Sequence, residues 1–289
     1  MDPLIAILPY GLKYEKALED LSLDQLIFPL GMKVPKDLKK VSDLRRSDHL
    51  IVYCCSTAFL RSHRKLKCAV SMLIAEPQAV QARNYILSLF FWKKFKYVLT
   101  YSEWLLKILP NAIFHLGPGK TVEPASQIDK QSLLSIIASK KNKLPGQRLR
   151  HEFINECLSR GIKISLFGRG YKAVEKKEEA LSSYMFSVVI ENCRELNYYS
   201  EKLLDCFLQK TVPIYWGAPN IGEFFNADGM VVCSSIEELI HECANLRPEI
   251  FISKKAGIEE NFENARKIDE IPLAAALKIQ GLVGQVTRL

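Results

Sequence analysis

The chain has 289 residues, of which 48% are hydrophobic and 25% charged, and its formal net charge is +8. This apolar content excludes an intrinsically disordered chain, and the length suggests about two domains. No apolar run reaches the roughly 20 residues that a membrane-spanning helix needs. The basic residues are scattered as short pairs, which indicates a solvated surface and supports no nucleic-acid site; binding of phosphorylated ligands or anionic membranes is a weaker inference.

Short apolar runs alternate with amphipathic stretches over the first 116 residues. The apolar runs are short enough for strands and apolar on both faces, which is typical of a parallel sheet covered by helices on both sides. The pattern predicts strands over residues 4–8, 49–54, 69–75, 97–100 and 112–116, and helices over residues 14–21 and 80–94.

The segment Gly117–Pro124 interrupts this alternation, because its two glycines and two prolines cannot continue a helix or a central strand. The same alternation then starts again. It predicts strands over residues 133–138, 162–167, 186–190, 212–216 and 230–233, and helices over residues 147–159, 175–181, 200–208, 236–244, 248–268 and 273–286.

These elements predict the α/β class, with two Rossmann-like, doubly wound domains over residues 1–122 and 123–289. The first would be the acceptor side, and the second would include the C-terminal helices. In such folds a ligand binds beyond the carboxyl ends of the strands, so we expect the chemistry there and in a cleft that the domains face.

Polar side chains gather at one place in the second half, where a buried strand ends and the next helix begins. The first turn of a helix carries unpaired N–H groups and a partial positive charge, which suits a phosphate. Lys202 in that first turn opposes the helix dipole, a cost that a bound anion would offset. An ordinary capping arrangement, with Glu201 favouring the helix start and Lys202 solvated, explains the same residues without a ligand.

Residues 184–225 resemble the donor-binding motif of glycosyltransferase family 10, the α-1,3/4-fucosyltransferases. The motif elements read Ile190-Glu191-Asn192, then Tyr198-Tyr199-Ser200-Glu201-Lys202, then Val212 to Ile221 (VPIYWGAPNI). Upstream, residues 139–153 (SKKNKLPGQRLRHEF) are similar to a further family segment. The resemblance covers about residues 133–245 and is faint in the first half of the chain.

This resemblance implies a GT-B-like fold and an inverting fucosyltransferase that uses GDP-fucose without a required metal or other cofactor. The sequence contains no Asp-x-Asp pair that could chelate a metal at the diphosphate. By the resemblance, Arg150 and Lys202 would hold the diphosphate, with Arg148 as the neighbouring candidate. Glu201 would accept hydrogen bonds from the ribose, and the remaining donor-binding candidates are Glu191, Asn192, Tyr198 and Ser200.

Glu76 is the candidate general base, since it follows an apolar strand in the first half of the chain. Its Ala-Glu-Pro context departs from the family's Gly-Glu-Asn turn, and Glu103 and Glu191 are the substitutes. Because Ile190 replaces an aromatic residue of the family motif, the donor could instead be another UDP- or GDP-linked sugar. A non-catalytic glycan- or nucleotide-binding protein is the remaining alternative.

The expected partners are a nucleotide-sugar donor and a glycan acceptor, with no nucleic acid. Peripheral contact with a membrane stays open. The eight cysteines form no Cys-x-x-Cys pair and sit mostly within apolar runs, which indicates buried thiols in a reducing compartment. Together with the missing N-terminal anchor, this predicts a cytoplasmic enzyme of bacterial or viral type.

Overall fold

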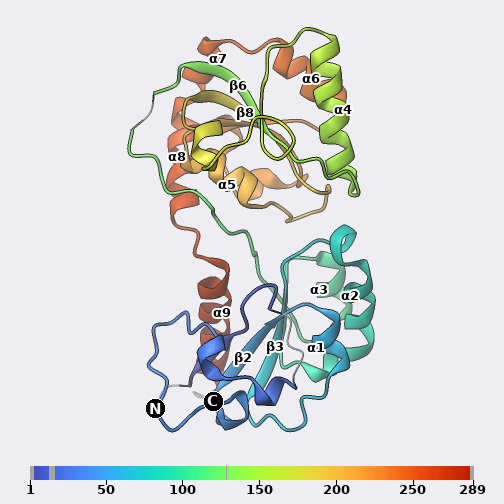
Figure 1. The fold of residues 1–289 in the computed structure, drawn as a ribbon, viewed down its shortest axis with the longest axis vertical. Coiled ribbons are helices and arrows are strands. Elements are labelled where there is room, and N and C mark those ends of the chain that lie inside the picture. The colour runs from blue at the N-terminus through green and yellow to red at the C-terminus, as the bar shows by residue number, and fades with distance from the viewer. Residues whose placement is uncertain (1–2, 13–16, 128, 287–289) are drawn as a thin grey trace. The chain divides into compact units, whose positions relative to one another are not determined.

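The computed structural model describes residues 3–12, 17–127 and 129–286. The chain divides into two compact units: unit 1 runs up to Gly117 and resumes at Asp269, and unit 2 comprises Pro118–Ile268. Each contains one five-stranded parallel sheet (Figure 1). In the described part of the chain, no helix combines the length and the apolar character needed to cross a membrane.

Unit 1 is built on a sheet whose strands lie in the order of the sequence. The strands β1 to β5 are Ile5–Ile7, His49–Tyr53, Ala69–Ile74, Val98–Thr100 and Ala112–Phe114. The helices α1, α2 and α3 are Ser56–Leu60, Gln78–Phe91 and Glu103–Ile108, with 3-10 turns at Leu18–Asp20, Leu23–Gln25, Val41–Asp43 and Trp92–Lys94 (η1 to η4). The predicted strands and the long helix are confirmed. Of the helix predicted over residues 14–21, residues 14–16 lie outside the described residues, and the turn Leu18–Asp20 is 3-10.

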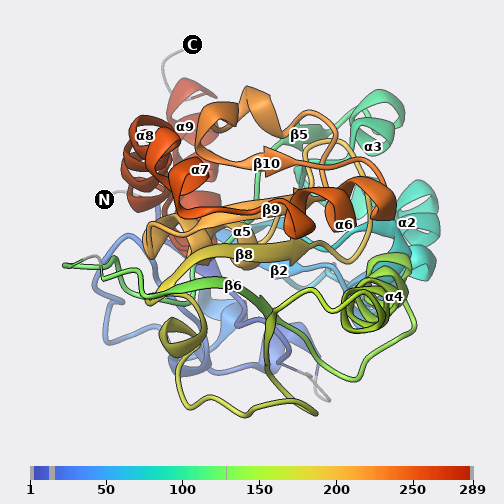
Figure 2. The ribbon, with the colours of Figure 1, turned by 90° about the horizontal axis from the view of Figure 1, so that it is seen from above.

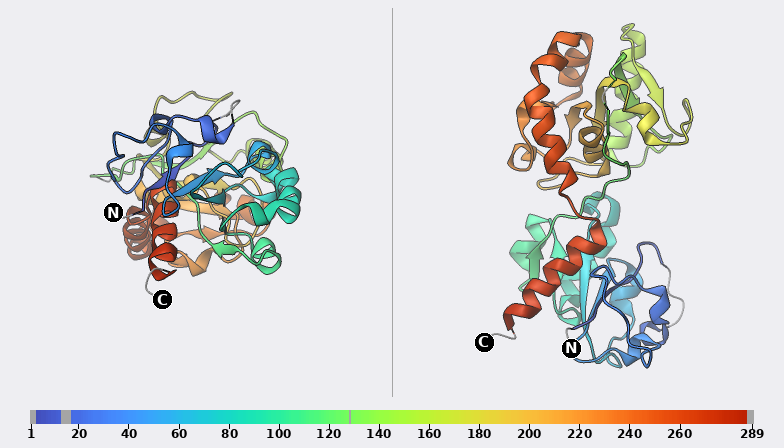
Figure 3. Two further views of the ribbon diagram at one scale, coloured as in Figure 1. Left: turned by 90° about the horizontal axis from the view of Figure 1, so that it is seen from below. Right: turned by 90° about the vertical axis from the view of Figure 1, so that its left-hand side faces the viewer.

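The two faces of this sheet have different covers. Side chains from alternate strand positions, such as Leu50 and Val52, pack with Phe59 of α1 and Tyr85 of α2. The opposite face is covered by α9 (Ile271–Val286) from the far end of the chain (Figure 3). Because the strand order never reverses, the connecting helices lie on one face and leave the other for a separate element. The doubly wound order predicted for both domains therefore holds only in unit 2.

The core contacts of α9 explain why the domain bounds differ from the predicted 1–122 and 123–289. Ala275, Ala276 and Ile279 are fully buried and pack against Ile5, Ile51, Leu73 and Leu99. The C-terminal helix thus belongs to unit 1, and the first connection between the units lies at Gly117 rather than after residue 122. The sequence pattern shows that α9 is apolar but not which sheet it covers.

Replacing Ile279 with alanine is expected to destabilise the protein by about 2–5 kcal/mol, since it removes a fully buried side chain and leaves a cavity. Urea unfolding followed by circular dichroism measures the change. Leu277→Ala on the same helix is the control, because Leu277 is 44% exposed. Equal losses in the two variants would contradict the packing of α9 described above.

Unit 2 has the strand order β7–β6–β8–β9–β10, which reverses between β6 and β8. Figure 2 shows β6, β8, β9 and β10 side by side. These strands are Ser132–Ile137 (β6), Ser165–Phe167 (β7), Tyr184–Ile190 (β8), Val212–Trp216 (β9) and Val231–Val232 (β10). The helices are Pro145–Ser159 (α4), Glu201–Leu208 (α5), Ile236–Ala244 (α6), Pro248–Ser253 (α7) and Lys255–Arg266 (α8), with 3-10 turns at Lys177–Ala180, Ile221–Glu223 and Ala227–Gly229 (η5 to η7).

Two helix predictions in unit 2 were wrong in detail. The helix expected over residues 175–181 is the single 3-10 turn η5, whose start is capped by the Glu179 carboxylate accepting from the Lys176 N–H at 2.9 Å. The helix expected over residues 248–268 is divided at Lys254, whose Nζ donates to the carbonyl of Met230 at 2.8 Å. The new helix brings Gly257 against Gly229 so closely that neither has room for a Cβ.

Candidate donor-binding site

A pocket of about 630 Å³ opens in unit 2 at the carboxyl ends of β6, β7 and β8. This is where the strand order reverses, and the connections that leave β6 and β8 there diverge to opposite faces of the sheet. The lining comes from the strand ends, from the loops after β6 and β7, and from α4, η5 and α5. The site therefore occupies the position that the fold provides for a ligand.

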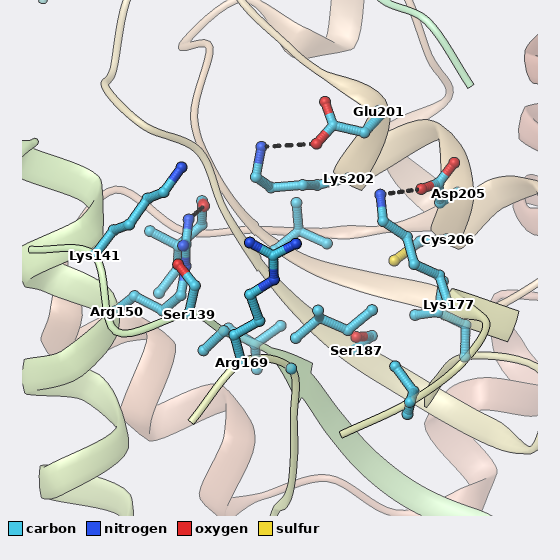
Figure 4. Close-up of a pocket in the computed structure, with 18 of the residues that line it drawn as sticks. Ser139, Lys141, Arg150, Arg169, Lys177, Ser187, Glu201, Lys202, Asp205 and Cys206 are labelled. Atoms are coloured by element: carbon cyan, nitrogen blue, oxygen red, sulfur yellow. Dashed lines mark hydrogen bonds and ion pairs between the residues drawn. The ribbon is translucent and has the colours of Figure 1, made fainter. Parts of the chain in front are cut away.

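Five basic side chains from five separate segments line this pocket, together with two acidic ones (Figure 4). The basic residues are Lys141 after β6, Arg150 on α4, Arg169 after β7, Lys177 on η5 and Lys202 on α5. The acidic residues, Glu201 and Asp205, both lie on α5. Such an excess of cations favours a polyanionic ligand, and guanidinium groups match the geometry of phosphate oxygens.

Lys202 is held in the pocket by groups at the start of α5. The carboxylate of Glu191, which is fully buried, accepts from the Ser200 N–H at 2.9 Å and from the Ser200 hydroxyl at 2.7 Å. Lys202 Nζ lies 2.9 Å from Ser200 Oγ, 3.3 Å from Glu201 Oε1 and 3.5 Å from Glu191 Oε2. Glu191 thus fixes the serine cap and the lysine together.

The charges of these groups follow from their neighbours. Burial alone would lower the pKa of Lys202, but Glu191 and Glu201 outweigh it and hold that pKa above its usual value. Burial would raise the pKa of Glu201, but Lys202 and Lys177 outweigh it and hold that pKa below its usual value. Both groups are therefore charged at neutral pH. The capping alternative had Lys202 solvated, but its side chain is only 28% exposed and is paired with Glu191 and Glu201. These ion pairs leave Lys202 at the pocket wall.

Arg150 reaches the pocket from the second turn of α4 and is buried. Its Nη2 donates to the carbonyl of Ile190 at the end of β8. The helix can lie this close because Gly146 in its first turn donates its N–H to the carbonyl of Asn192 at 3.0 Å, and any Cβ on Gly146 would clash with the carbonyl of Glu191. Burial lowers the pKa of the Arg150 guanidinium from its usual value, while the charges of Glu191 and Glu201 act in the opposite direction.

A second network secures the other side of the pocket. Asp205, which is 1% exposed, accepts from Lys177 Nζ at 2.9 Å and from the Thr121 N–H at 2.8 Å. Lys177 Nζ also donates to the Thr121 hydroxyl at 2.7 Å. Asp205 therefore fixes the segment after Gly117 and positions one of the five cations.

The structure brings together three of the predicted donor-binding residues as lining of one pocket: Arg150, Glu201 and Lys202. Glu191 and Ser200 lie directly behind them as the support described above. Arg148 is exposed, donates to the carbonyl of Lys143 at 2.7 Å and is not part of the lining.

Asn192 and Tyr198 also lie outside the lining of this pocket. Asn192 Nδ2 is 3.5 Å from the hydroxyl of Tyr198, and Tyr198 is buried. Both residues therefore lie in the loop between β8 and α5, outside the pocket.

Glu76 belongs to unit 1, directly after β3, and its Oε1 accepts from the hydroxyl of Tyr10 at 3.1 Å. The Tyr10 ring packs edge-on against Tyr53 at the end of β2, with ring centroids 5.1 Å apart. Glu76 is thus held at the carboxyl edge of its own sheet. Of its two substitutes, Glu103 pairs with Lys107 at 3.4 Å on α3, and Glu191 is committed to Ser200 and Lys202.

Four charged residues of the lining were not predicted from the sequence: Lys141, Arg169, Lys177 and Asp205. The position of the first two, directly after strands, was a usable signal, since side chains at the carboxyl ends of parallel strands share one edge. Lys177 and Asp205 lie in segments that were predicted as helices, where charged residues are ordinary surface residues. Only the folded chain places the two together.

Replacing Glu191 with glutamine is expected to raise the Kd for the donor by about tenfold, because the amide cannot hold Lys202 as the carboxylate does. The loss of a buried ionic partner also lowers stability, by roughly 3–5 kcal/mol at most. Donor titration by calorimetry measures the first effect and urea unfolding the second. The expectation fails if the variant binds donor as the unmodified protein does.

Comparisons with known proteins match the part of the chain that contains this pocket. The model of the family "Glycosyltransferase family 10 (fucosyltransferase) C-term" matches residues 128–241. An α-(1,3)-fucosyltransferase FucT of Helicobacter pylori is 40% identical over 62 residues, which are 22% of this chain and 13% of that protein. A putative fucosyltransferase-like protein of Arabidopsis thaliana is 28% identical over 118 residues, 39% of this chain and 23% of that one. The matched segments thus span less than a quarter of either curated relative.

The crystal structure of an α1,3-fucosyltransferase with GDP-fucose superposes with a TM-score of 0.50 at 17% identity, covering 80% of this chain and 77% of that one. This likeness confirms the predicted α/β, GT-B-like fold class with two parallel-sheet domains. The family match includes β6 to β9 and every basic residue of the pocket lining. Residues 128–241 of this chain are therefore similar to the C-terminal domain of the fucosyltransferases of glycosyltransferase family 10.

Proposed function

We propose that the chain is an inverting fucosyltransferase that transfers L-fucose from GDP-fucose to a hydroxyl of a glycan, without a required metal. The observation that carries this proposal is the pocket of unit 2, in which five basic side chains surround the ligand position of a family 10 domain. The named relative is a fucosyltransferase, and the superposed structure is one with GDP-fucose. Both support this choice of donor.

In this mechanism the pocket stabilises the nucleoside diphosphate as it leaves. Negative charge grows on the leaving phosphates while the sugar becomes oxocarbenium-like, so fixed cations stabilise the transition state more than the ground state. Arg150 supplies a bidentate donor and Lys202 a point charge. Arg169 and Lys177 extend the same positive field. Glu201 accepts hydrogen bonds from the ribose hydroxyls.

The acceptor hydroxyl must lose a proton as it attacks the anomeric carbon from the face opposite the diphosphate. We assign this step to Glu76 as the general base, with the Tyr10 hydroxyl bonded to one carboxylate oxygen. A single displacement of this kind inverts the anomeric centre. The acceptor needs only a nucleophilic hydroxyl at this point, which suits a glycan.

The proposal is tested by offering the purified chain GDP-fucose, GDP-mannose and UDP-glucose in separate reactions. Thermal shift reports binding, since a ligand that binds only the native state raises apparent stability. Release of GDP in the presence of a mixed glycan pool reports transfer, and the same assay with EDTA tests the metal requirement. GDP-fucose is expected to bind and turn over in both conditions. Binding of only UDP-glucose would show that the donor is a UDP-linked sugar and not GDP-fucose. Binding of no nucleotide sugar would favour a non-catalytic protein over an enzyme.

A further inference from the structure

One region of unit 1 is rich in basic residues that have no role in the proposed reaction. Between Asp48 and Glu103 the chain contains one acidic residue, Glu76, and eight basic ones. The basic residues fall in two groups, residues 61–67 after α1 and residues 83–96 on α2 and η4. The sequence shows two ordinary groups of charges, and only the fold places them beside one another.

Direct contacts join the two groups into one surface. Lys94 of η4 donates from Nζ to the carbonyls of Phe59 and Arg61 at the end of α1. The rings of Phe59 and Phe95 meet edge to face, with centroids 5.8 Å apart. Ser56 of α1 donates to Asn84 of α2 at 3.2 Å. The segment Ser56–Lys96, with β3 within it, therefore presents the outer surface of α1, α2 and η4 as a preformed unit.

Large apolar side chains project from this basic surface. Phe90 on the last turn of α2 is 74% exposed, Leu60 at the end of α1 is 59% exposed, and Ile86 one turn before Phe90 is 54% exposed. Single exposed hydrophobic residues are common, but three of them on adjoining helices among arginines and lysines form an amphipathic surface.

A recess of about 530 Å³ adjoins this surface. Its lining includes Trp92, Lys93 and Lys96, with His63 on the side of α1. Asn111 fixes the floor, since its Nδ2 donates to the carbonyls of Trp92 and Phe95 at 3.2 and 2.8 Å. Lys93 and Lys96 are both exposed. The recess is wide enough to admit a phosphate group, and its aromatic wall suits the boundary between headgroup and acyl chain.

The recess lies at the amino-terminal edge of the sheet of unit 1. Its residues lie at the start of β3 and directly before β4, whereas Glu76 directly follows β3. A partner in the recess would therefore lie at the opposite end of the sheet from Glu76.

We propose that the basic-apolar surface formed by α1, residues 61–67, α2 and η4 docks unit 1 onto a bilayer that contains anionic lipid. The lysines and arginines are complementary to the negative headgroups, and Leu60, Ile86 and Phe90 enter the headgroup–acyl boundary, as interfacial amphipathic elements do. A nucleic acid would satisfy the charges but would offer no apolar layer to these aliphatic side chains.

The test is co-sedimentation of the full chain with vesicles. Pure phosphatidylcholine vesicles are compared with vesicles of equal parts phosphatidylcholine and phosphatidylglycerol. Binding is expected to the anionic vesicles alone and to weaken as salt is raised. Lys93→Glu with Lys96→Glu is expected to weaken it roughly 30-fold or more, since each cation near such a surface contributes about a fivefold factor. Ile86→Ser with Phe90→Ser is expected to weaken it at all salt concentrations.

Matched controls come from exposed residues of unit 2. Lys163→Glu with Lys255→Glu changes the net charge equally, and Leu158→Ser with Ile252→Ser removes equally exposed apolar side chains. These controls are expected to bind vesicles normally. Equal losses in the controls, equal binding to neutral vesicles, or binding of duplex DNA but no vesicles would overturn the proposal. Self-association abolished by Phe90→Ser without vesicle binding would assign the surface to a second copy of the chain.

Discussion

Replacing Lys202 with alanine is expected to lower fucose transfer from GDP-fucose by about 100- to 1000-fold, the range seen when one preorganised donor to a developing charge is removed. Lys202 Nζ is held between Ser200, Glu201 and the fully buried Glu191. In the proposed mechanism it therefore meets the diphosphate without first having to be ordered. The variant removes that cation and also leaves the Glu191 carboxylate without its ionic partner.

The measurement is steady-state GDP release together with donor titration by calorimetry. Both the donor affinity and the turnover number are expected to fall, since in the proposed mechanism the lysine contacts the diphosphate before and during its departure. Lys210→Ala, in the connection that follows α5, is the control. Lys210 pairs with Glu259 at 2.6 Å and is no part of the pocket lining, so its loss should affect stability and leave the kinetics unchanged. A Lys202→Ala enzyme with normal donor affinity and rate would refute the assignment of the site.

Replacing Glu76 with glutamine is expected to reduce turnover by about 100- to 10,000-fold, the usual contribution of a general base, while donor affinity stays near normal. The amide keeps the shape of the side chain and can still accept from the Tyr10 hydroxyl, which lies 3.1 Å from Glu76 Oε1. It cannot take the proton of the acceptor. Steady-state turnover and donor titration by calorimetry measure the two effects.

Two companion variants make this result specific. Tyr10→Phe removes the hydrogen bond and keeps the carboxylate, so a smaller fall in turnover is expected. Glu103→Gln removes only an exposed partner of Lys107 and should have no effect. If the Glu76→Gln enzyme is active and the Glu103→Gln enzyme is inactive, Glu103 is the general base instead of Glu76.

The sequence predicted best those features of the fold and the site that depend on residues close together in the chain. The buried strand Tyr184–Ile190 and the serine cap of α5 are local features, and both lie where the pattern predicts them. Glu201 and Lys202 follow from the motif over residues 184–225 and Arg150 from the upstream segment 139–153, and all three line one pocket. The neighbouring candidates could not be separated in this way, because Arg148 and Arg150 differ only in the side of α4 that each occupies.

Features that depend on contacts distant in the sequence were not predictable. Lys177 joins the pocket through Asp205, and the carboxylate of Asp205 also holds Thr121. The basic-apolar surface of unit 1 depends on α1 lying beside η4, so the sequence shows only a few separate lysines and arginines. The position of α9 is a third case, since an apolar helix can cover any sheet that lacks a layer.

The position of α9 also sets the order in which the chain can fold during synthesis. Unit 2 is completed at residue 268, before residues 271–286 have been made, whereas unit 1 needs those last residues to cover Ile5, Ile51, Leu73 and Leu99. The half of the molecule that is translated first is thus the half that matures last. Until then the ribosome-bound chain carries one exposed apolar sheet face, where a chaperone would be expected to bind.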